Sequence, residues 1–75
     1  MIFARASMNT LSKRFGKKVR KTRLDKGLSQ GDIARRLKLH RSYISGIERG
    51  VRNPSLGVVE KIAKALGIPV RELLK

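Results

Sequence analysis

One short segment of the sequence sets hydrogen-bonding side chains against an apolar back. On a helix, at about 100° per residue, Ile44 and Ile47 share one face. Ser42 and Ser45 lie on the opposite face, with Arg41 at the N-terminal flank. An arginine fork matches the O6 and N7 acceptors of guanine, and serine hydroxyls donate or accept at base edges. The pattern predicts a helix that reads bases in the major groove of DNA.

Two other residues of this segment each allow two interpretations. Tyr43 can reach a phosphate or a thymine methyl group, or it can pack beside Ile47. Gly46 either brings the helix backbone close to DNA or permits close packing against another element. A polar outer face is common on any exposed helix, so the interpretation depends on the surrounding domain.

That domain is small and strongly basic. The 75 residues carry 19 Lys and Arg against 5 Asp and Glu, which gives a net charge of +14. Such a charge favours polyanionic partners, first nucleic acid and second an anionic membrane surface. Hydrophobic residues make up 40% of the chain, enough for one folded domain. The length leaves little room for an enzyme with a substrate pocket of its own.

Several kinds of chemistry lack the residues that they need. The sequence has no Cys and a single His, which excludes disulfides and a zinc site. It offers no Gly-rich phosphate loop and no nucleophile paired with a base. We therefore expect no catalytic residue, no metal, no cofactor and no small-molecule ligand. No stretch has the apolar length of a signal peptide or membrane span, so we expect a cytoplasmic protein without a membrane partner.

The elements that position these side chains follow from apolar spacing and from helix-end signals. The string Ser29-Gln30-Gly31-Asp32 has the spacing of a capping box, which begins a helix at Gln30. We expect an all-α fold, with helices over about 12–26, 30–37, 40–49, 56–66 and 70–74. Residues 1–11 lack a sustained period and are expected to form a loosely held extension, so that residues 12–75 make up the domain.

The second and third expected helices, joined by a short turn in a basic domain, have the outline of a helix-turn-helix. Gln30 lies in the first helical turn, where free amides favour a phosphate, although an exposed Gln without a partner is the alternative. Arg49, Arg52 and Asn53 crowd the following loop and are predicted to contact phosphates. His40 is predicted to contact phosphate too, with capping of the third helix as the alternative.

Two further sets of residues have structural rather than DNA-binding roles. Glu48 lies in a basic region without a second acid or a base, so we expect it to pair with Arg23 rather than to act in catalysis. Val58, Val70 and Leu74 are more apolar residues than one small core needs, and they predict a dimer interface.

Several strings of the sequence resemble the Xre or lambda-repressor-like helix-turn-helix family over residues 13–74. They are Gly27-Leu28-Ser29-Gln30, Tyr43-Ile44-Ser45-Gly46-Ile47-Glu48-Arg49-Gly50, Arg52-Asn53-Pro54-Ser55-Leu56 and Ala63-Lys64-Ala65-Leu66-Gly67. The stretch from Arg41 to Arg49 is most similar to controller proteins of restriction-modification systems. The resemblance implies a five-helix domain and a sequence-specific transcriptional regulator that binds a two-fold symmetric operator as a homodimer.

One departure from the family and two alternative functions stay open at this point. Lys38 stands where the family usually has Gly or Asn, so we expect strain of about 1 kcal/mol in the turn, or another geometry. An antitoxin or phage-type repressor, whose main partner is another protein, is one alternative function. A non-specific cationic binder of nucleic acid is the other, because the charge alone suffices for it.

Overall fold

A computed structural model describes the chain from residue 2 to residue 75, with side chains described from Leu11 onward. Its helices are α1 (Ile2–Asp25), α2 (Gln30–Leu37), α3 (Arg41–Glu48), α4 (Leu56–Leu66) and α5 (Val70–Leu74). Every regular element in the described part of the chain is a helix. The expected all-α, five-helix fold is therefore confirmed.

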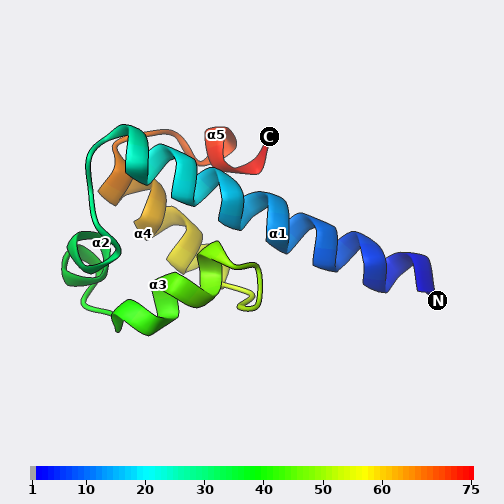
Figure 1. Ribbon diagram of the computed structural model, residues 1–75. Helices are drawn as coiled ribbons and strands as arrows, with labels where there is room; N and C mark the ends of the chain where they lie inside the picture. Colours follow the sequence, from blue (N-terminus) through cyan, green and yellow to red (C-terminus); the bar gives the residue numbers. More distant parts are fainter. Residues whose placement is uncertain (1) are drawn as a thin grey trace.

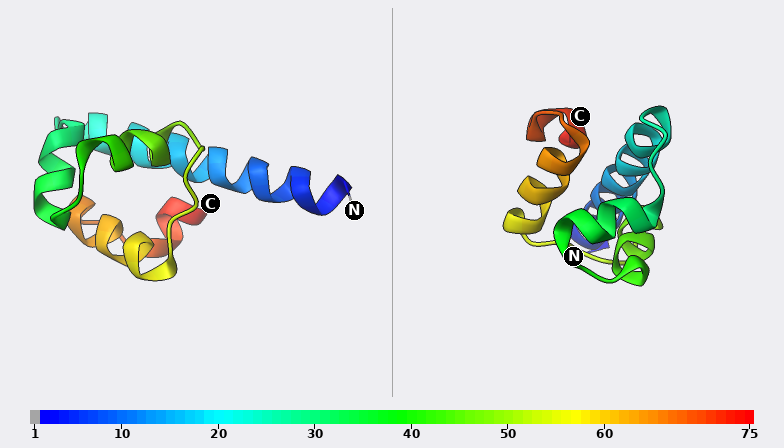
Figure 2. Two further views of the ribbon diagram at one scale, coloured as in Figure 1. Left: turned by 90° about the horizontal axis from the view of Figure 1, so that it is seen from below. Right: turned by 90° about the vertical axis from the view of Figure 1, so that its left-hand side faces the viewer.

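The helices pack around α1, which is the longest of them (Figure 1). Helix α1 contacts α3, α4 and α5, and α2 bridges α3 and α4. The N-terminal half of α1 projects beyond the other helices (Figures 1 and 2). All five helices contribute to one core, whose buried residues include Phe15, Val19, Ile33, Ile44, Ile47, Ile62, Leu66 and Leu73.

Helix α1 starts earlier than the sequence pattern predicted. We expected a loosely held extension over residues 1–11, but α1 begins at Ile2 and runs without interruption into the domain. Extending an existing helix fixes only one residue for each added hydrogen bond, and this segment includes good helix formers such as Ala, Met and Arg. The helix therefore begins about ten residues earlier than expected, residue 1 lies outside the described residues, and the division into an extension and a domain at residue 12 stays a prediction.

Helix α2 begins with the predicted capping box. The Asp32 amide donates to the Ser29 hydroxyl over 3.0 Å, and the Ser29 amide donates to the Asp32 carboxylate over 2.8 Å. The pKa of Asp32 lies below its ordinary value, chiefly because its carboxylate accepts the hydrogen bond from the Ser29 amide. This cap fixes where α2 starts and therefore where Gln30 lies.

The backbone is strained in the turn between α2 and α3, as expected from the Lys that stands where similar proteins usually have Gly or Asn. Lys38 adopts φ 57° and ψ 41°, the left-handed region, and it is the one non-glycine residue with positive φ among those described. A side chain in this region costs about 1–2 kcal/mol. The expected turn geometry is thus kept, and Lys38 is strained.

Lys38→Gly is expected to raise the free energy of unfolding by about 0.5–1 kcal/mol, because relief of the strain exceeds the entropy that glycine adds to the unfolded chain. The matched control is Lys64→Gly inside α4, where the same substitution should lower stability by about 1 kcal/mol. Urea denaturation of both variants measures the difference. Destabilisation by Lys38→Gly would contradict a strained turn.

Candidate nucleic-acid interface

Helix α3 has the two faces that the spacing predicted. Ile44 and Ile47 are fully buried in the core. Arg41 and Ser42 are exposed, and Tyr43 and Ser45 are half-buried at the edge of the outer face. The structure therefore exposes two of the four predicted base-reading residues fully and the other two in part.

Close packing of α1 against the end of α3 holds this helix in place. A Cβ built onto Gly16 would lie only 2.2 Å from the Ile47 carbonyl oxygen and 2.8 Å from that of Glu48. No side chain fits between these backbones, so only glycine allows this approach. Gly16 was not among the residues that the sequence analysis singled out, because its role depends on the crossing of two helices.

A buried ion pair joins α1 to the C-terminal end of α3. Arg23 Nε and Nη2 donate to the two carboxylate oxygens of Glu48 over 2.6 and 2.9 Å. The Arg23 side chain is 8% exposed and that of Glu48 only 2%. Arg23 Nη1 also donates to the Leu28 carbonyl oxygen over 2.8 Å. The predicted pair thus consists of two hydrogen bonds that join α1 to α3. The third bond ties Arg23 to the turn that leads into α2.

Gln30 is part of the same network. Its amide nitrogen donates to Glu48 Oε1 over 3.1 Å, and the residue is half-buried. An amide nitrogen carries two hydrogens, so one stays available for a phosphate in the first turn of α2. Gln30 is therefore held in one orientation by Glu48, which the sequence analysis did not anticipate.

Three of the residues predicted to contact phosphates lie at the end of α3 and in the loop that follows it. Arg49, Arg52 and Asn53 are all exposed there. Arg52 also lies over the Tyr43 ring, with its guanidinium carbon 5.8 Å from the ring centroid. Gly46 is buried beneath this side chain, which favours the packing interpretation of Gly46 over close approach to DNA.

His40 occupies the N-cap position of α3, yet its side chain caps no backbone amide. The capping alternative for this side chain was therefore wrong. Its Nδ1 lies 3.4 Å from the Ser42 hydroxyl oxygen, and both residues are exposed. His40 thus adds another polar group beside the outer face of α3.

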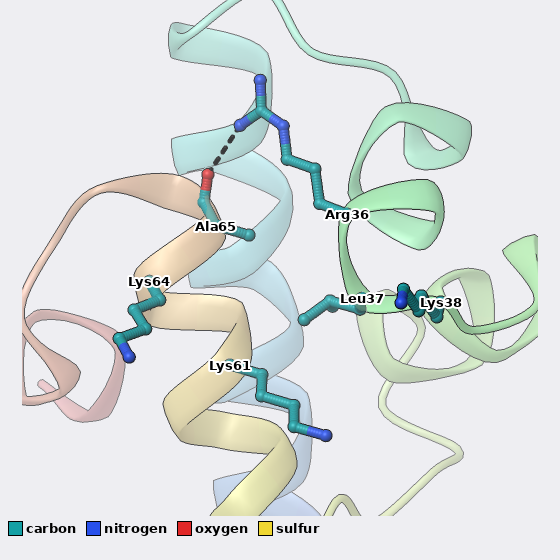
Figure 3. Close-up of a pocket in the computed structure, with 6 residues that line it drawn as sticks. All are labelled: Arg36, Leu37, Lys38, Lys61, Lys64 and Ala65. Atoms are coloured by element: carbon teal, nitrogen blue, oxygen red, sulfur yellow. Dashed lines mark hydrogen bonds between the residues drawn. The ribbon is translucent and has the colours of Figure 1, made fainter.

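A second basic surface lies between α2 and α4 (Figure 3). Arg36, Lys38, Lys61 and Lys64 line it with Leu37 and Ala65. Arg36 Nη1 donates to the Ala65 carbonyl oxygen over 2.8 Å, so this arginine is used to tie α2 to the end of α4. In Figure 3, Lys64 points away from Lys61, and the cations do not converge on one point.

The predicted dimer residues differ in exposure. Val58 and Val70 pack against the core of their own chain and are half-buried, whereas Leu74 is 49% exposed.

The described residues 2–75 were also compared with the requirements of a membrane span and of a metal site. No helix there is long and apolar enough to cross a membrane, and no three His, Cys, Asp or Glu residues gather in a way that could hold a metal ion.

Comparison with known proteins places this arrangement in a family. The family model described as helix-turn-helix matches residues 19–73, which is most of the chain. The chain belongs to the helix-turn-helix family. This family consists of DNA-binding transcriptional regulators.

The relatives of this helix-turn-helix protein include several controller proteins. It is 52% identical to the control protein C.BamHI of Bacillus amyloliquefaciens over 67 residues, which cover 88% of this chain and 83% of the relative. The restriction-modification controller protein C.AhdI from Aeromonas hydrophila has a similar structure, with a TM-score of 0.80 and 48% identity over 83% of this chain and 94% of that one.

A second similar structure contains DNA. It is the restriction-modification controller protein C.Esp1396I, as a tetramer in complex with its natural 35 base-pair operator. Its TM-score is 0.74 at 37% identity, over 87% of this chain and 96% of that one. The helix-turn-helix protein is thus a sequence-specific DNA-binding regulator with controller proteins among its relatives.

Proposed function

We propose that this protein is a controller of the restriction-modification type, which binds a two-fold symmetric operator as a homodimer. Arg41, Ser42, Tyr43 and Ser45 read base edges in the major groove of each half-site. The observation that carries the proposal is the outer face of α3, where Arg41 and Ser42 are exposed above the fully buried Ile44 and Ile47. We expect the protein to act in the cytoplasm, without enzymatic activity or a cofactor.

Five residues around α3 serve the phosphate backbone in this proposal. They come from the start of α2, the N-cap of α3 and the loop after α3, so they border the recognition helix at both ends. Their charges and amides fix the position of the protein on the duplex. They are Gln30, His40, Arg49, Arg52 and Asn53.

A charge-free groove supports the homodimer. Residues of α1, α4, α5 and the loop before α4 line it: Leu11, Ser12, Phe15, Asn53, Pro54, Leu56, Val59 and Leu74. Leu56 is 85% exposed. Two copies with a net charge of +14 each repel one another, so self-association is favoured where charges are absent and apolar surface is exposed. We therefore place Leu74 in the interface with Leu56 and Leu11. Val58 and Val70 do not line this groove and stay predicted interface residues.

Leu74→Lys is expected to weaken dimerisation by about tenfold or more, because each copy loses burial of a leucine and gains a like charge at the two-fold interface. Sedimentation equilibrium measures the dissociation constant. The matched control is Leu24→Lys at the end of α1, since Leu24 is 52% exposed and does not line the groove. Equal dissociation constants for both variants would remove Leu74 from the interface.

Selection of bound duplexes from a random DNA pool, at near-physiological salt, tests the proposed function. We expect enrichment of a two-fold site whose half-sites are about 34 Å apart, one turn of DNA. A flat pool with steep salt dependence would indicate the non-specific cationic binder instead. A protein partner that co-purifies at equal stoichiometry, with no enriched site, would indicate the antitoxin or phage-type alternative.

A further inference from the structure

The loop that follows α3 turns back onto the helix that it has just left. The Gly46 carbonyl oxygen accepts two backbone hydrogen bonds, from the Val51 amide over 3.0 Å and from the Arg52 amide over 3.2 Å. These bonds place the start of the Arg52 side chain beside the helix backbone at Gly46. The start of the loop is therefore anchored to α3 by backbone hydrogen bonds.

Gly46 makes room for the stem of Arg52. A Cβ built onto Gly46 would lie 2.6 Å from Arg52 Cγ, 3.5 Å from Nε and 3.6 Å from Cδ. Any side chain at position 46 therefore displaces the Arg52 stem from α3. The absence of a side chain at this one position is what lets the arginine lie flat along the helix.

The end of that stem reaches Tyr43. The guanidinium carbon lies 5.8 Å from the ring centroid, within the usual range of a cation–π contact. Tyr43 and Gly46 are three residues apart and neighbours on one side of α3, so the same arginine covers both. A guanidinium that rests its face on a ring keeps its N–H edges available for a phosphate.

We propose that Arg52 is a positioning residue that holds the Tyr43 ring in its base-reading orientation, and that Gly46 makes this contact possible. This inference rests on the proposed function, in which Tyr43 touches a base. A tyrosine rotates about two bonds, and a ring held in advance loses less freedom when it meets DNA. Arg52 then affects discrimination between sequences, whereas a phosphate contact alone strengthens binding to all sequences alike.

Gly46→Ala separates the two roles because it displaces Arg52 without removing its charge. Alanine favours a helix more than glycine does, but Arg52 Cγ, which lies close to the backbone of the loop, has to move to make room for the new Cβ. The matched control is Gly57→Ala in α4, where the nearest atom to the new Cβ is the Ser55 hydroxyl oxygen at 3.8 Å. Gly57→Ala is expected to unfold at or above the wild-type temperature, and a thermal unfolding curve of Gly46→Ala checks that the domain is folded at the temperature of the assays.

The first readout needs no DNA. Tyr43 is the only tyrosine and the chain has no tryptophan, so tyrosine fluorescence reports on this ring alone. We expect Gly46→Ala to change the emission intensity and to increase quenching by acrylamide, with wild-type values for Gly57→Ala. Unchanged fluorescence in Gly46→Ala would overturn the positioning role.

The second readout is competition binding with the selected operator and a scrambled duplex of equal length. We expect Gly46→Ala to lower the operator-to-scrambled affinity ratio about fivefold, and Arg52→Lys to lower it in the same direction at constant charge. A wild-type ratio in both variants, or equal losses on both duplexes, overturns the inference and leaves the proposed function standing. A wild-type protein without operator preference overturns both.

Discussion

Glu48→Ala is expected to lower the free energy of unfolding by about 3–5 kcal/mol, because it leaves the buried Arg23 guanidinium without its counter-charge. Only the Leu28 carbonyl oxygen would still accept a hydrogen bond from it. Hydrogen bonding to the Glu48 carboxylate raises the pKa of Arg23 above its ordinary value, with burial acting in the opposite direction. An arginine does not lose its proton in a folded protein, so the charge has to stay buried.

Urea denaturation measures this loss, and the exposed pair of Lys21 and Asp25 supplies the control. Those two side chains are 74% and 65% exposed, with 3.3 Å between nitrogen and oxygen. Asp25→Ala should cost less than about 0.5 kcal/mol. The double variant Arg23→Met with Glu48→Leu should regain most of the stability that Glu48→Ala loses, since it removes both charges together. A loss below about 1 kcal/mol in Glu48→Ala would contradict this account.

The sequence predicts this pair but not the network around it. Glu48 stands out because acids are rare in the chain, and a lone carboxylate in a basic region calls for a partner. That the same carboxylate also accepts a hydrogen bond from Gln30 depends on how α2 crosses the end of α3. Gln30 and Glu48 are 18 residues apart, so their contact depends on tertiary packing and cannot be predicted from the spacing of residues within one helix.

In α3, too, the sequence predicts the faces of the helix but not what covers them. The alternation of apolar and polar residues predicts correctly that Ile44 and Ile47 are buried and that Arg41 and Ser42 are exposed. It does not predict that Arg52, six residues beyond Gly46, returns to cover the helix. A helical period describes the faces of one element, whereas the covering of a face depends on the path of the next loop.

In residues 2–11 the structure has a helix that the sequence pattern did not predict. Their pattern of apolar residues is irregular, and an amphipathic period is the strongest sign by which a helix is predicted. Helix α1 nevertheless starts at Ile2. Its N-terminal half projects beyond the other helices, so packing against them does not impose a regular apolar period on this part of the sequence.

Arg41→Ala is expected to remove discrimination at one base position of each half-site. Arg41 is exposed at the start of α3, where the N-terminal end of a recognition helix meets the base edges. A two-pronged arginine contact to guanine contributes about 1–3 kcal/mol of discrimination, roughly 5- to 150-fold. Because a dimer makes this contact in both half-sites, the free energy of discrimination doubles for a whole operator.

The measurement compares the selected operator with duplexes in which each base of the half-site is changed in turn. Wild-type protein should lose affinity at the position that Arg41 reads, and Arg41→Ala should bind all four bases there equally. Arg49→Ala is the control, because it removes another exposed positive charge, from the other end of α3. It should weaken every duplex alike and reduce the dependence of log affinity on log salt by about one unit. If Arg41→Ala produces that same uniform loss, Arg41 serves a phosphate, and the base preference of the protein comes from the serines and Tyr43.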